Sequence, residues 1–251
     1  MSREVAIRLQ GVSKRYYLGT PVGDGLKHLL LHLPSQIKAI RQRKPFDALV
    51  DISFDVHRGE CLSLIGRNGA GKSTTLGMIA GVLKPSAGTL ETHGRISPLL
   101  ELGAGFNQQL TGRENIMLNG VMLGLTRREV RERTAEIIAF SELEDFIDAP
   151  LRTYSSGMIV RLGFSVAVHL DPDILLVDEV LAVGDARFRQ KCLERMKQFR
   201  SRGTTMVFVS HDVGTVAKIS DRVAFLESGR LVEIGDPAKA IEAYQGRLRA
   251  A

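Results

Sequence analysis

The sequence predicts an α/β fold in which a mainly parallel sheet carries an inserted helical lobe. Short apolar segments alternate with helical patterns over most of the chain, and this alternation is typical of parallel sheets. Residues 112–170 differ, because they show helical periodicity and no clear strand. We therefore expect a core over about residues 1–102 and 171–251, and a helical subdomain over about residues 103–170.

Each expected strand is a short run of apolar and β-branched residues, and each expected helix repeats its apolar residues every three or four positions. Asp236 and Pro237 indicate the start of the last helix, as an N-cap and a first-turn proline. The expected strands are Val5–Leu9, Val50–Val56, Cys61–Ile65, Ile174–Val177, Thr205–Val209, Val223–Leu226 and Leu231–Ile234. The expected helices are Lys72–Leu83, Asn115–Leu123, Arg127–Phe140, Ser156–Leu170, Asp185–Arg202 and Ala238–Gln245.

Composition excludes several classes of protein. The chain has 251 residues, of which 44% are hydrophobic, so it can bury a sizeable core. Its two cysteines, Cys61 and Cys192, cannot form a disulfide framework or a four-ligand metal site, and we interpret them as reduced thiols of a cytosolic protein. Charged residues interrupt the N-terminal segment and every window of about 18 residues, so neither a signal peptide nor a transmembrane helix is expected.

The excess of positive charge lies near the start of the chain. The net charge is +6; residues 1–50 hold nine Lys and Arg against three Asp and Glu, whereas the other residues hold 25 of each. An insertion at about 18–48 separates the first two strands, and within it Gly25–Ile40 is typical of an amphipathic helix. A basic helix of this kind suits an anionic membrane surface; the alternative is a surface helix whose leucines cover the core. The basic residues of this helix and of the segment directly after it are Lys27, Lys38, Arg41, Arg43 and Lys44.

A phosphate-binding loop is predicted between the strand Cys61–Ile65 and the helix that follows. Residues 66–73, Gly-Arg-Asn-Gly-Ala-Gly-Lys-Ser, match the pattern G-x-x-x-x-G-K-[ST]. Glycines let successive backbone N–H groups converge on one point, and the helix N-terminus adds partial positive charge. Lys72 would reach the β- and γ-phosphates, and Ser73 would ligate Mg²⁺. The residues expected to bind nucleotide here are Gly66, Arg67, Asn68, Gly69, Ala70, Gly71, Lys72, Ser73 and Thr74.

Two carboxylates follow the apolar strand at residues 174–177. Asp178 would hold Mg²⁺ through water, and Glu179 would lie nearer the γ-phosphate, where a carboxylate can polarise an attacking water. Two acidic residues at a strand end are also compatible with a solvated surface. The phosphate loop earlier in the chain favours the catalytic interpretation.

Three further motifs occur in the order typical of one family, and with them the chain resembles the ATPase subunits of ABC transporters. The first, Tyr-Ser-Ser-Gly-Met at residues 154–158, is similar to the family's signature motif, usually Leu-Ser-Gly-Gly-Gln. Ser155 and Gly157 match that motif, whereas Ser156 and Met158 depart from it. Taken alone, Ser-Ser-Gly would also suit an ordinary helix N-cap.

The second and third motifs lie later in the chain. Val-Ser-His-Asp at residues 209–212 resembles the segment with the family's switch histidine, here His211. Val-Gly-Asp at residues 183–185 resembles the family's D-loop more loosely, with Asp185 as its acidic residue. The resemblance covers essentially the whole chain, and no guanine-reading Asn-Lys-x-Asp motif is present in the sequence.

The resemblance implies a RecA-like phosphate-loop ATPase core with a mixed sheet and an inserted helical subdomain. It implies ATP and Mg²⁺ as cofactors and a homodimer in which two chains sandwich two nucleotides. The signature residues Ser155, Ser156 and Gly157 of one chain would face the γ-phosphate held by the other, and Asp185 would act across the interface. The catalytic residues carried over are Lys72, Asp178, Glu179 and His211.

Two positions remain open within the resemblance. The family usually carries a glutamine at the junction of core and helical subdomain, and Glu101 stands there; its carboxylate could ligate Mg²⁺ or water, or be a solvated loop charge. Gln108 or Gln109 could substitute for the missing glutamine. The family also stacks adenine on an aromatic side chain of its N-terminal β region. Tyr16 is the candidate for that position, with Tyr17 and Phe46 as alternatives.

Residues 99–106, Leu-Leu-Glu-Leu-Gly-Ala-Gly-Phe, followed by Thr-Gly-Arg-Glu-Asn at 111–115, look like the subfamily that exports O-antigen, capsule and teichoic acid. This implies a separate integral-membrane subunit, a lipid-linked glycan near residues 25–44 and a peripheral location on the cytoplasmic face of the membrane. The membrane subunit would dock near residues 101–111. The alternative is a soluble ABC ATPase acting on nucleic acid or ribosomes, which the basic segment could suit. Since the motifs favour export, we expect no nucleic-acid partner.

Overall fold

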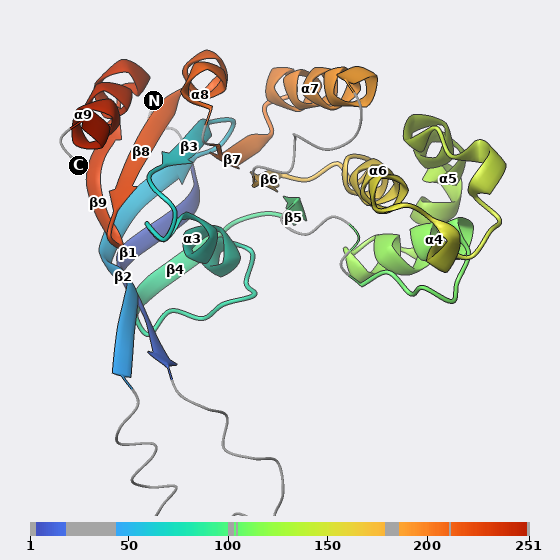
Figure 1. Ribbon diagram of the computed structural model, residues 1–251, viewed down its shortest axis with the longest axis horizontal. Helices are drawn as coiled ribbons and strands as arrows, with labels where there is room; N and C mark the ends of the chain where they lie inside the picture. The colour runs from blue at the N-terminus through green and yellow to red at the C-terminus, as the bar shows by residue number, and fades with distance from the viewer. Residues whose placement is uncertain are drawn as a thin grey trace, which may run out of the picture.

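The computed structural model describes residues 4–18, 44–99, 103, 105–178, 186–210 and 212–249 (Figure 1). They form a three-stranded sheet in the order β2-β1-β4 and a six-stranded sheet in the order β5-β6-β7-β3-β8-β9. The strands are β1 Val5–Leu18, β2 Lys44–His57, β3 Cys61–Ile65, β4 Ala87–Thr92, β5 Ile96–Leu99, β6 Ile174–Val177, β7 Thr205–Val209, β8 Arg222–Glu227 and β9 Arg230–Gly235. The α-helices are α3 Lys72–Ile79, α4 Gly112–Met122, α5 Arg127–Ser141, α6 Ser156–Ala167, α7 Ala186–Ser201, α8 Val213–Ile219 and α9 Pro237–Arg249. Two short 3₁₀ helices cover Glu144–Phe146 and Leu151–Thr153.

The six-stranded sheet is mixed, as predicted. Strands β5, β6, β7, β3 and β8 pair in parallel, and β9 pairs antiparallel with β8. Its central strands β3, β6 and β7 are buried along their whole length, because both faces of the sheet are covered. Strand β7 lies between β3 and β6, so the two strands that carry the predicted phosphate-site residues are separated by one neighbour.

Three hydrophobic clusters hold these layers together. One lies between the two sheets and includes α3, with Leu62 and Leu76 at its centre. A second covers the opposite face of the six-stranded sheet, where Phe188 of α7 and Phe225 of β8 are buried together with residues of α8 and α9. The third is formed by α4, α5 and α6, which lie together at one end of the molecule (Figure 1). Helix α6 contributes to both the second and the third cluster, so it joins the helical lobe to the core.

The helices of the lobe begin where the sequence offers a strong N-cap. Thr111 and Thr126 each accept a hydrogen bond from the backbone N–H three residues on, and Glu114 and Glu129 complete the two capping boxes. These hydrogen bonds hold the pKa of both glutamates below the ordinary value. The predicted helices are confirmed where the structure describes them, with ends shifted by a few residues. The two largest shifts are in α3, which ends at Ile79 rather than at residue 83, and in α9, which ends at Arg249 rather than at residue 245.

The first two strands are longer than predicted. Strand β1 runs to Leu18 rather than Leu9, and β2 begins at Lys44 rather than Val50. Polar residues interrupt the apolar pattern in residues 10–18 and 44–49, so the strand signal is weak in both segments. The antiparallel pairing of β1 with β2 nevertheless continues through them, with β-bulges at the register shifts. The backbone of residues 18 and 44–48 therefore belongs to strands rather than to the predicted insertion. The predicted helix at residues 25–40 lies outside the described residues.

Strands β4 and β5 were not predicted. Strand β4 is exposed along much of its length, so its sequence has no strong apolar signal. Strand β5 contains Pro98, which lacks a backbone N–H and argues against a strand in sequence. It is tolerated because β5 is an edge strand of the six-stranded sheet and pairs only with β6.

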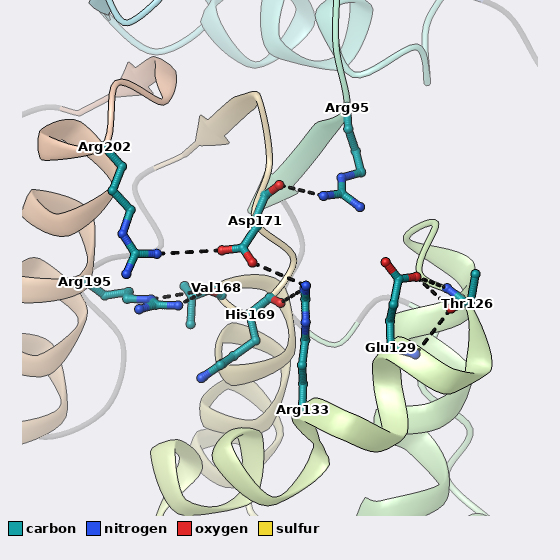
Figure 2. A network of polar contacts seen from close by, with 9 residues as sticks. All are labelled: Arg95, Thr126, Glu129, Arg133, Val168, His169, Asp171, Arg195 and Arg202. Atoms are coloured by element: carbon teal, nitrogen blue, oxygen red, sulfur yellow. Dashed lines mark hydrogen bonds and ion pairs between the residues drawn. The ribbon is translucent and has the colours of Figure 1, made fainter.

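A network of arginines joins the helical lobe to the core at the end of α6 (Figure 2). Arg133 of α5 donates to the carbonyl oxygen of His169 and forms an ion pair with Asp171, with 3.3 Å between Nη2 and Oδ2. Arg195 of α7 donates to the carbonyl oxygen of Val168 at 2.9 Å. Arginines at the C-terminal end of a helix satisfy its last carbonyls and favour its dipole.

The same network continues into the core beside β5. Arg95 donates to the carbonyl oxygen of Asp171 at 2.7 Å, and Arg202 lies 3.8 Å from the Asp171 carboxylate (Figure 2). Asp171 has a φ of 45°, a backbone conformation that few residues other than glycine adopt. The residues between α6 and β6 are thus held by side chains from three other segments of the chain.

Arg133→Ala is expected to lower the free energy of unfolding by about 1.5–3 kcal/mol, because it removes charged hydrogen bonds from a half-buried site. The measurement is urea unfolding followed by circular dichroism. Arg131→Ala on the same helix is the matched control, since Arg131 is exposed, and its effect should stay within about 0.5 kcal/mol. Equal stabilities for the two variants would contradict the role given to Arg133.

Both cysteines, Cys61 of β3 and Cys192 of α7, are free and buried in the second hydrophobic cluster. Burial raises the pKa of each thiol to about 12, so both are protonated at neutral pH.

Among the described residues, no helix has the length and apolarity needed to cross a bilayer.

Candidate functional site

The predicted phosphate loop connects β3 to α3 and turns tightly between them. Gly66 and Gly71 have φ values of 149° and 103°. A Cβ on Gly66 would collide with the carbonyl oxygen of Leu226, and a Cβ on Gly71 would collide with Leu49 and Ala48. Only glycine fits at both places, so glycines here let the loop pack closely against β8 and β2. Glycine-rich loops of this kind let backbone N–H groups converge on an anion.

Lys72 is the first residue of α3 and is held inside the loop. The residue is only 6% exposed. Nζ donates to the carbonyl oxygens of Gly66 at 2.7 Å and Arg67 at 3.1 Å. The ammonium group therefore adds a positive charge to the loop where the helix N-terminus already attracts an anion.

Asp178 reaches the same point from another strand. It follows β6, whereas Ser73 stands in the first turn of α3, and 3.5 Å separates Ser73 Oγ from Asp178 Oδ2. A hydroxyl and a carboxylate this close at the carboxyl ends of parallel strands suit a hard cation that also binds phosphate oxygens. Among the described residues, no three His, Cys, Asp or Glu side chains gather to hold a metal alone.

A cavity of about 460 Å³ opens in front of the loop. Residues from five parts of the chain line it, so it exists only in the folded protein. Two aromatic side chains, Tyr16 and Phe46, stand on its wall and face each other across the β1–β2 pair. Lys14 Nζ lies 5.2 Å from the centre of the Tyr16 ring. The other lining residues are Ala48, Asn68, Gly69, Gly71, Lys72, Ser73, Thr74, Asp178 and Val209.

Tyr17, an alternative to Tyr16 as the aromatic platform, does not line this cavity and is 61% exposed. Neighbouring residues of a strand point to opposite faces, so only one of the two tyrosines can face the loop. Phe46, the other alternative, lies beside Tyr16 in the cavity wall. The structure therefore brings two of the three candidates together.

The three signature residues lie elsewhere. Ser155 is the N-cap of α6, and its Oγ accepts a hydrogen bond from Met158 N at 3.2 Å. Ser155 and Ser156 are exposed and Gly157 is half-buried, and none of them lines the cavity. The helix N-terminus at this place thus faces solvent in the single chain. Glu101, Glu179, Asp185 and His211 lie outside the described residues.

Several other residues predicted for the site do not line the nucleotide cavity. Gly66, Arg67 and Ala70 do not line the cavity, although Gly66 and Arg67 hold Lys72. Gln108 and Gln109 are exposed in the loop before α4 and do not line it either. Another, smaller cavity lies on the other side of the phosphate loop. It is lined partly by Tyr244 and Arg247 of α9, a neighbour that no local pattern predicted.

Strand β3, the phosphate loop, Lys72 and the acidic end of β6 are typical of a phosphate-loop nucleoside triphosphatase. One strand, β7, lies between its two nucleotide-binding strands. The family model described as "ABC transporter" matches residues 49–182. The chain belongs to the ABC transporter family, as the sequence motifs predicted, and it is an ATPase that binds ATP.

Curated relatives match over nearly the whole chain. Two O-antigen export system ATP-binding proteins RfbB of Klebsiella pneumoniae are 51% identical; the first match covers 96% of this chain and 98% of the relative. A teichoic acids export ATP-binding protein TagH of Enterococcus faecalis is 42% identical, over 99% of this chain and 54% of the relative.

Solved structures share the fold. A dimeric post-hydrolysis state of the ATP-binding cassette MJ0796, bound to ADP and Pi, has a TM-score of 0.72 at 22% identity, over 92% of this chain and 98% of that one. An ATP-binding subunit of an ABC transporter has a TM-score of 0.73 at 23% identity, over 96% of this chain and 95% of that one. The predicted fold class is confirmed.

Proposed function

We propose that this chain is the ATP-hydrolysing subunit of an exporter of lipid-linked polysaccharide, peripheral to the cytoplasmic face of the membrane. The observation that carries the proposal is the 51% identity to O-antigen export ATP-binding proteins over almost the full length of both chains. The cavity that gathers Lys72, Ser73 and Asp178 supports the ATPase part of it. Whichever glycan is moved, a separate integral-membrane subunit would carry it.

In this proposal the phosphates of ATP lie against the loop. The backbone N–H groups of the loop and Lys72 would hold the β- and γ-phosphates, and the aromatic wall would take the base. Because Lys72 donates to two loop carbonyls, its ammonium group is already held within the phosphate loop. The energy of binding is then available to fix the γ-phosphate for attack by water.

The residues present fit Mg²⁺. Mg²⁺ prefers oxygen ligands and is usually held by one or two protein groups together with waters and phosphate oxygens. Ser73 Oγ and Asp178, 3.5 Å apart, are such a pair. When bound, the ion would neutralise charge that develops on the phosphates.

Turnover would require a second copy of the chain. The exposed N-terminus of α6, with Ser155 and Gly157, would face the γ-phosphate bound by the other copy, since helix N-termini bind anions. Glu179 would polarise the attacking water, His211 would contact the γ-phosphate and Asp185 would act across the dimer. Because the γ-phosphate would contact both copies, ATP would favour the closed dimer and hydrolysis would release it.

The membrane subunit would dock beside the loop before α4, near residues 101–111. Two large apolar side chains at the end of α4 support this position: Val121 is 40% exposed and Met122 is 62% exposed. The thioether group of Met122 lies beside Gly105, so this side chain is next to the loop before α4. Apolar groups of this kind are common in protein–protein interfaces.

Tyr16→Ala is expected to weaken ADP binding by about 1–3 kcal/mol, the usual contribution of stacking a base on an aromatic ring. Tyr17→Ala is the matched control, because Tyr17 is 61% exposed and does not line the cavity. Isothermal titration calorimetry measures both. If Phe46→Ala alone weakens binding and Tyr16→Ala does not, the platform is Phe46.

The export proposal is tested in the cell that makes this protein. Lys72→Ala should remove polysaccharide from the surface and leave lipid-linked glycan inside, whereas the exposed-lysine variant Lys84→Ala should leave export intact. ATPase activity of the purified variants is measured in parallel. Unchanged surface polysaccharide combined with lost ATPase activity would reject the substrate class and leave the ATPase assignment standing.

The basic segment at residues 25–44 is proposed to lie near the diphosphate of the lipid-linked glycan or near lipid headgroups. Its charge, opposite in sign to both, supports this. Neutralising Arg41, Arg43 and Lys44 together should reduce export while the ATPase activity of the purified chain stays normal. Export at the normal rate in that variant would exclude the contact.

A further inference from the structure

A second cavity, on the face of the six-stranded sheet between α7 and α8, is separate from the nucleotide cavity. Its volume is about 420 Å³, within the range of about 300–1,000 Å³ typical of small-molecule sites. The two cavities share no lining residue. We call this second cavity the α7–α8 groove; Figure 1 shows the two helices on the same side of the sheet, with β7 below them.

The floor and walls of the α7–α8 groove are apolar. Cys61 of β3 and Met206 and Phe208 of β7 form the floor, and each is at most 3% exposed. Leu193 and Met196 of α7 form one wall, and Ile219 of α8 stands on the other. Methionine is flexible and polarisable, so a lining of this kind adapts to apolar ligands of different shapes.

Helix periodicity explains why the two helices leave an open groove. The α7 residues that line it, 193, 196, 197 and 200, lie on one face of the helix at three- and four-residue spacing. The α8 residues, 215, 218 and 219, do the same. Helix α8 has only seven residues and buries only Val216 among them, so it covers little of the sheet beside α7. Leu193 is therefore left 37% exposed on the groove wall.

The rim of the groove is positively charged. Lys197, Arg200 and Lys218 line it, and no acidic residue does. Arg200 is ion-paired with Asp221 at 2.8 Å, and Lys218 is near enough to the Asp212 carboxylate to help lower its pKa. Among the described residues Lys197 forms no ion pair. Helix α7 carries six Lys and Arg against one Glu, although the chain after residue 50 is neutral overall. The groove thus combines an apolar interior with two lysines at its edge.

We propose that the α7–α8 groove binds a single-chain anionic amphiphile, with its apolar body over Met206 and Phe208 and its acidic head between Lys197 and Lys218. Charge complementarity selects this occupant: a cationic amphiphile would be repelled at the rim, and a neutral one would leave the Lys197 ammonium group without an opposite charge. This proposal does not depend on the substrate of export, since the groove shares no residue with the nucleotide cavity.

The test uses 8-anilinonaphthalene-1-sulfonate, an aromatic body with one negative charge, whose fluorescence rises in apolar sites. The double variant Lys197→Glu/Lys218→Glu should weaken its binding to the folded chain at least about tenfold, or about 1.4 kcal/mol. The control Arg189→Glu/Lys239→Glu changes the net charge equally at exposed positions outside the groove, and it should bind like the unmodified chain. Equal weakening in both variants would overturn the proposal.

Competition separates the groove from other apolar surfaces. Decanoate should displace the dye, whereas decanol and decyltrimethylammonium, with the same tail, should require at least about tenfold more. ADP should leave the dye bound, because the nucleotide occupies the other cavity. Leu193→Ser, which removes an exposed wall residue, should also weaken binding. Displacement by ADP, or equal competition by decanol and decanoate, would reject the α7–α8 groove as the site.

Discussion

Lys72→Ala is expected to raise the Kd for ATP by roughly 10- to 150-fold, which corresponds to about 1.5–3 kcal/mol for hydrogen bonds that involve a charged group. The lysine is 6% exposed and lies inside the phosphate loop, where Nζ donates to Gly66 and Arg67. Its loss removes a positive charge from the phosphate site and two hydrogen bonds from the loop. Isothermal titration calorimetry with ATP and Mg²⁺ measures the change.

The control for this variant is Lys84→Ala, which removes an exposed lysine from the loop after α3. Its Kd for ATP should equal that of the unmodified chain. Circular dichroism must show that Lys72→Ala is folded, because the loop also packs against β8 and β2. A folded Lys72→Ala variant with unchanged affinity would remove Lys72 from the phosphate site.

Glu179→Gln is expected to lower the rate of ATP hydrolysis by about 10²–10⁴-fold, the usual contribution of a general base. Glutamine has nearly the same shape but cannot accept a proton from water, so binding of ATP should persist. If ATP holds two copies together until it is hydrolysed, this variant should accumulate as a dimer. Steady-state phosphate release and size-exclusion chromatography in ATP measure the two effects.

Glu233→Gln makes the same chemical change on β9, at an exposed position away from the nucleotide cavity. It should hydrolyse ATP at the normal rate and stay monomeric or dimeric like the unmodified chain. Glu179→Gln with normal turnover would exclude Glu179 as the base. Slow turnover without accumulation of dimer would keep the base and reject the proposed link between hydrolysis and separation of the copies.

The phosphate loop was predictable because its chemistry is local. Eight consecutive residues, 66–73, supply the glycines, the lysine and the hydroxyl, and the strand before them is apolar throughout. The same is true of the helix starts at Thr111 and Thr126, where each capping box spans four residues. In these segments the backbone conformation is set by residues that are close together in the sequence.

The missed strands show where local patterns fail. Strand β4 is stabilised by its pairing with β1 rather than by apolar residues of its own. Strand β5 contains a proline that only an edge position tolerates. Edge position and strand order depend on segments far away in sequence, so periodicity within a window cannot reveal them.

By itself, the sequence determined the class of this protein: a phosphate loop after a buried strand, an acidic strand end, and motifs in the order typical of ABC ATPases. Only the tertiary structure decided which side chains meet. Ser73 and Asp178 are 105 positions apart and come within 3.5 Å because β7 sets the spacing between β3 and β6. Tyr16 rather than Tyr17 faces the cavity because strand residues alternate and the register of β1 with β2 places Phe46 opposite. Contacts of this kind depend on strand order and register, which long-range packing sets.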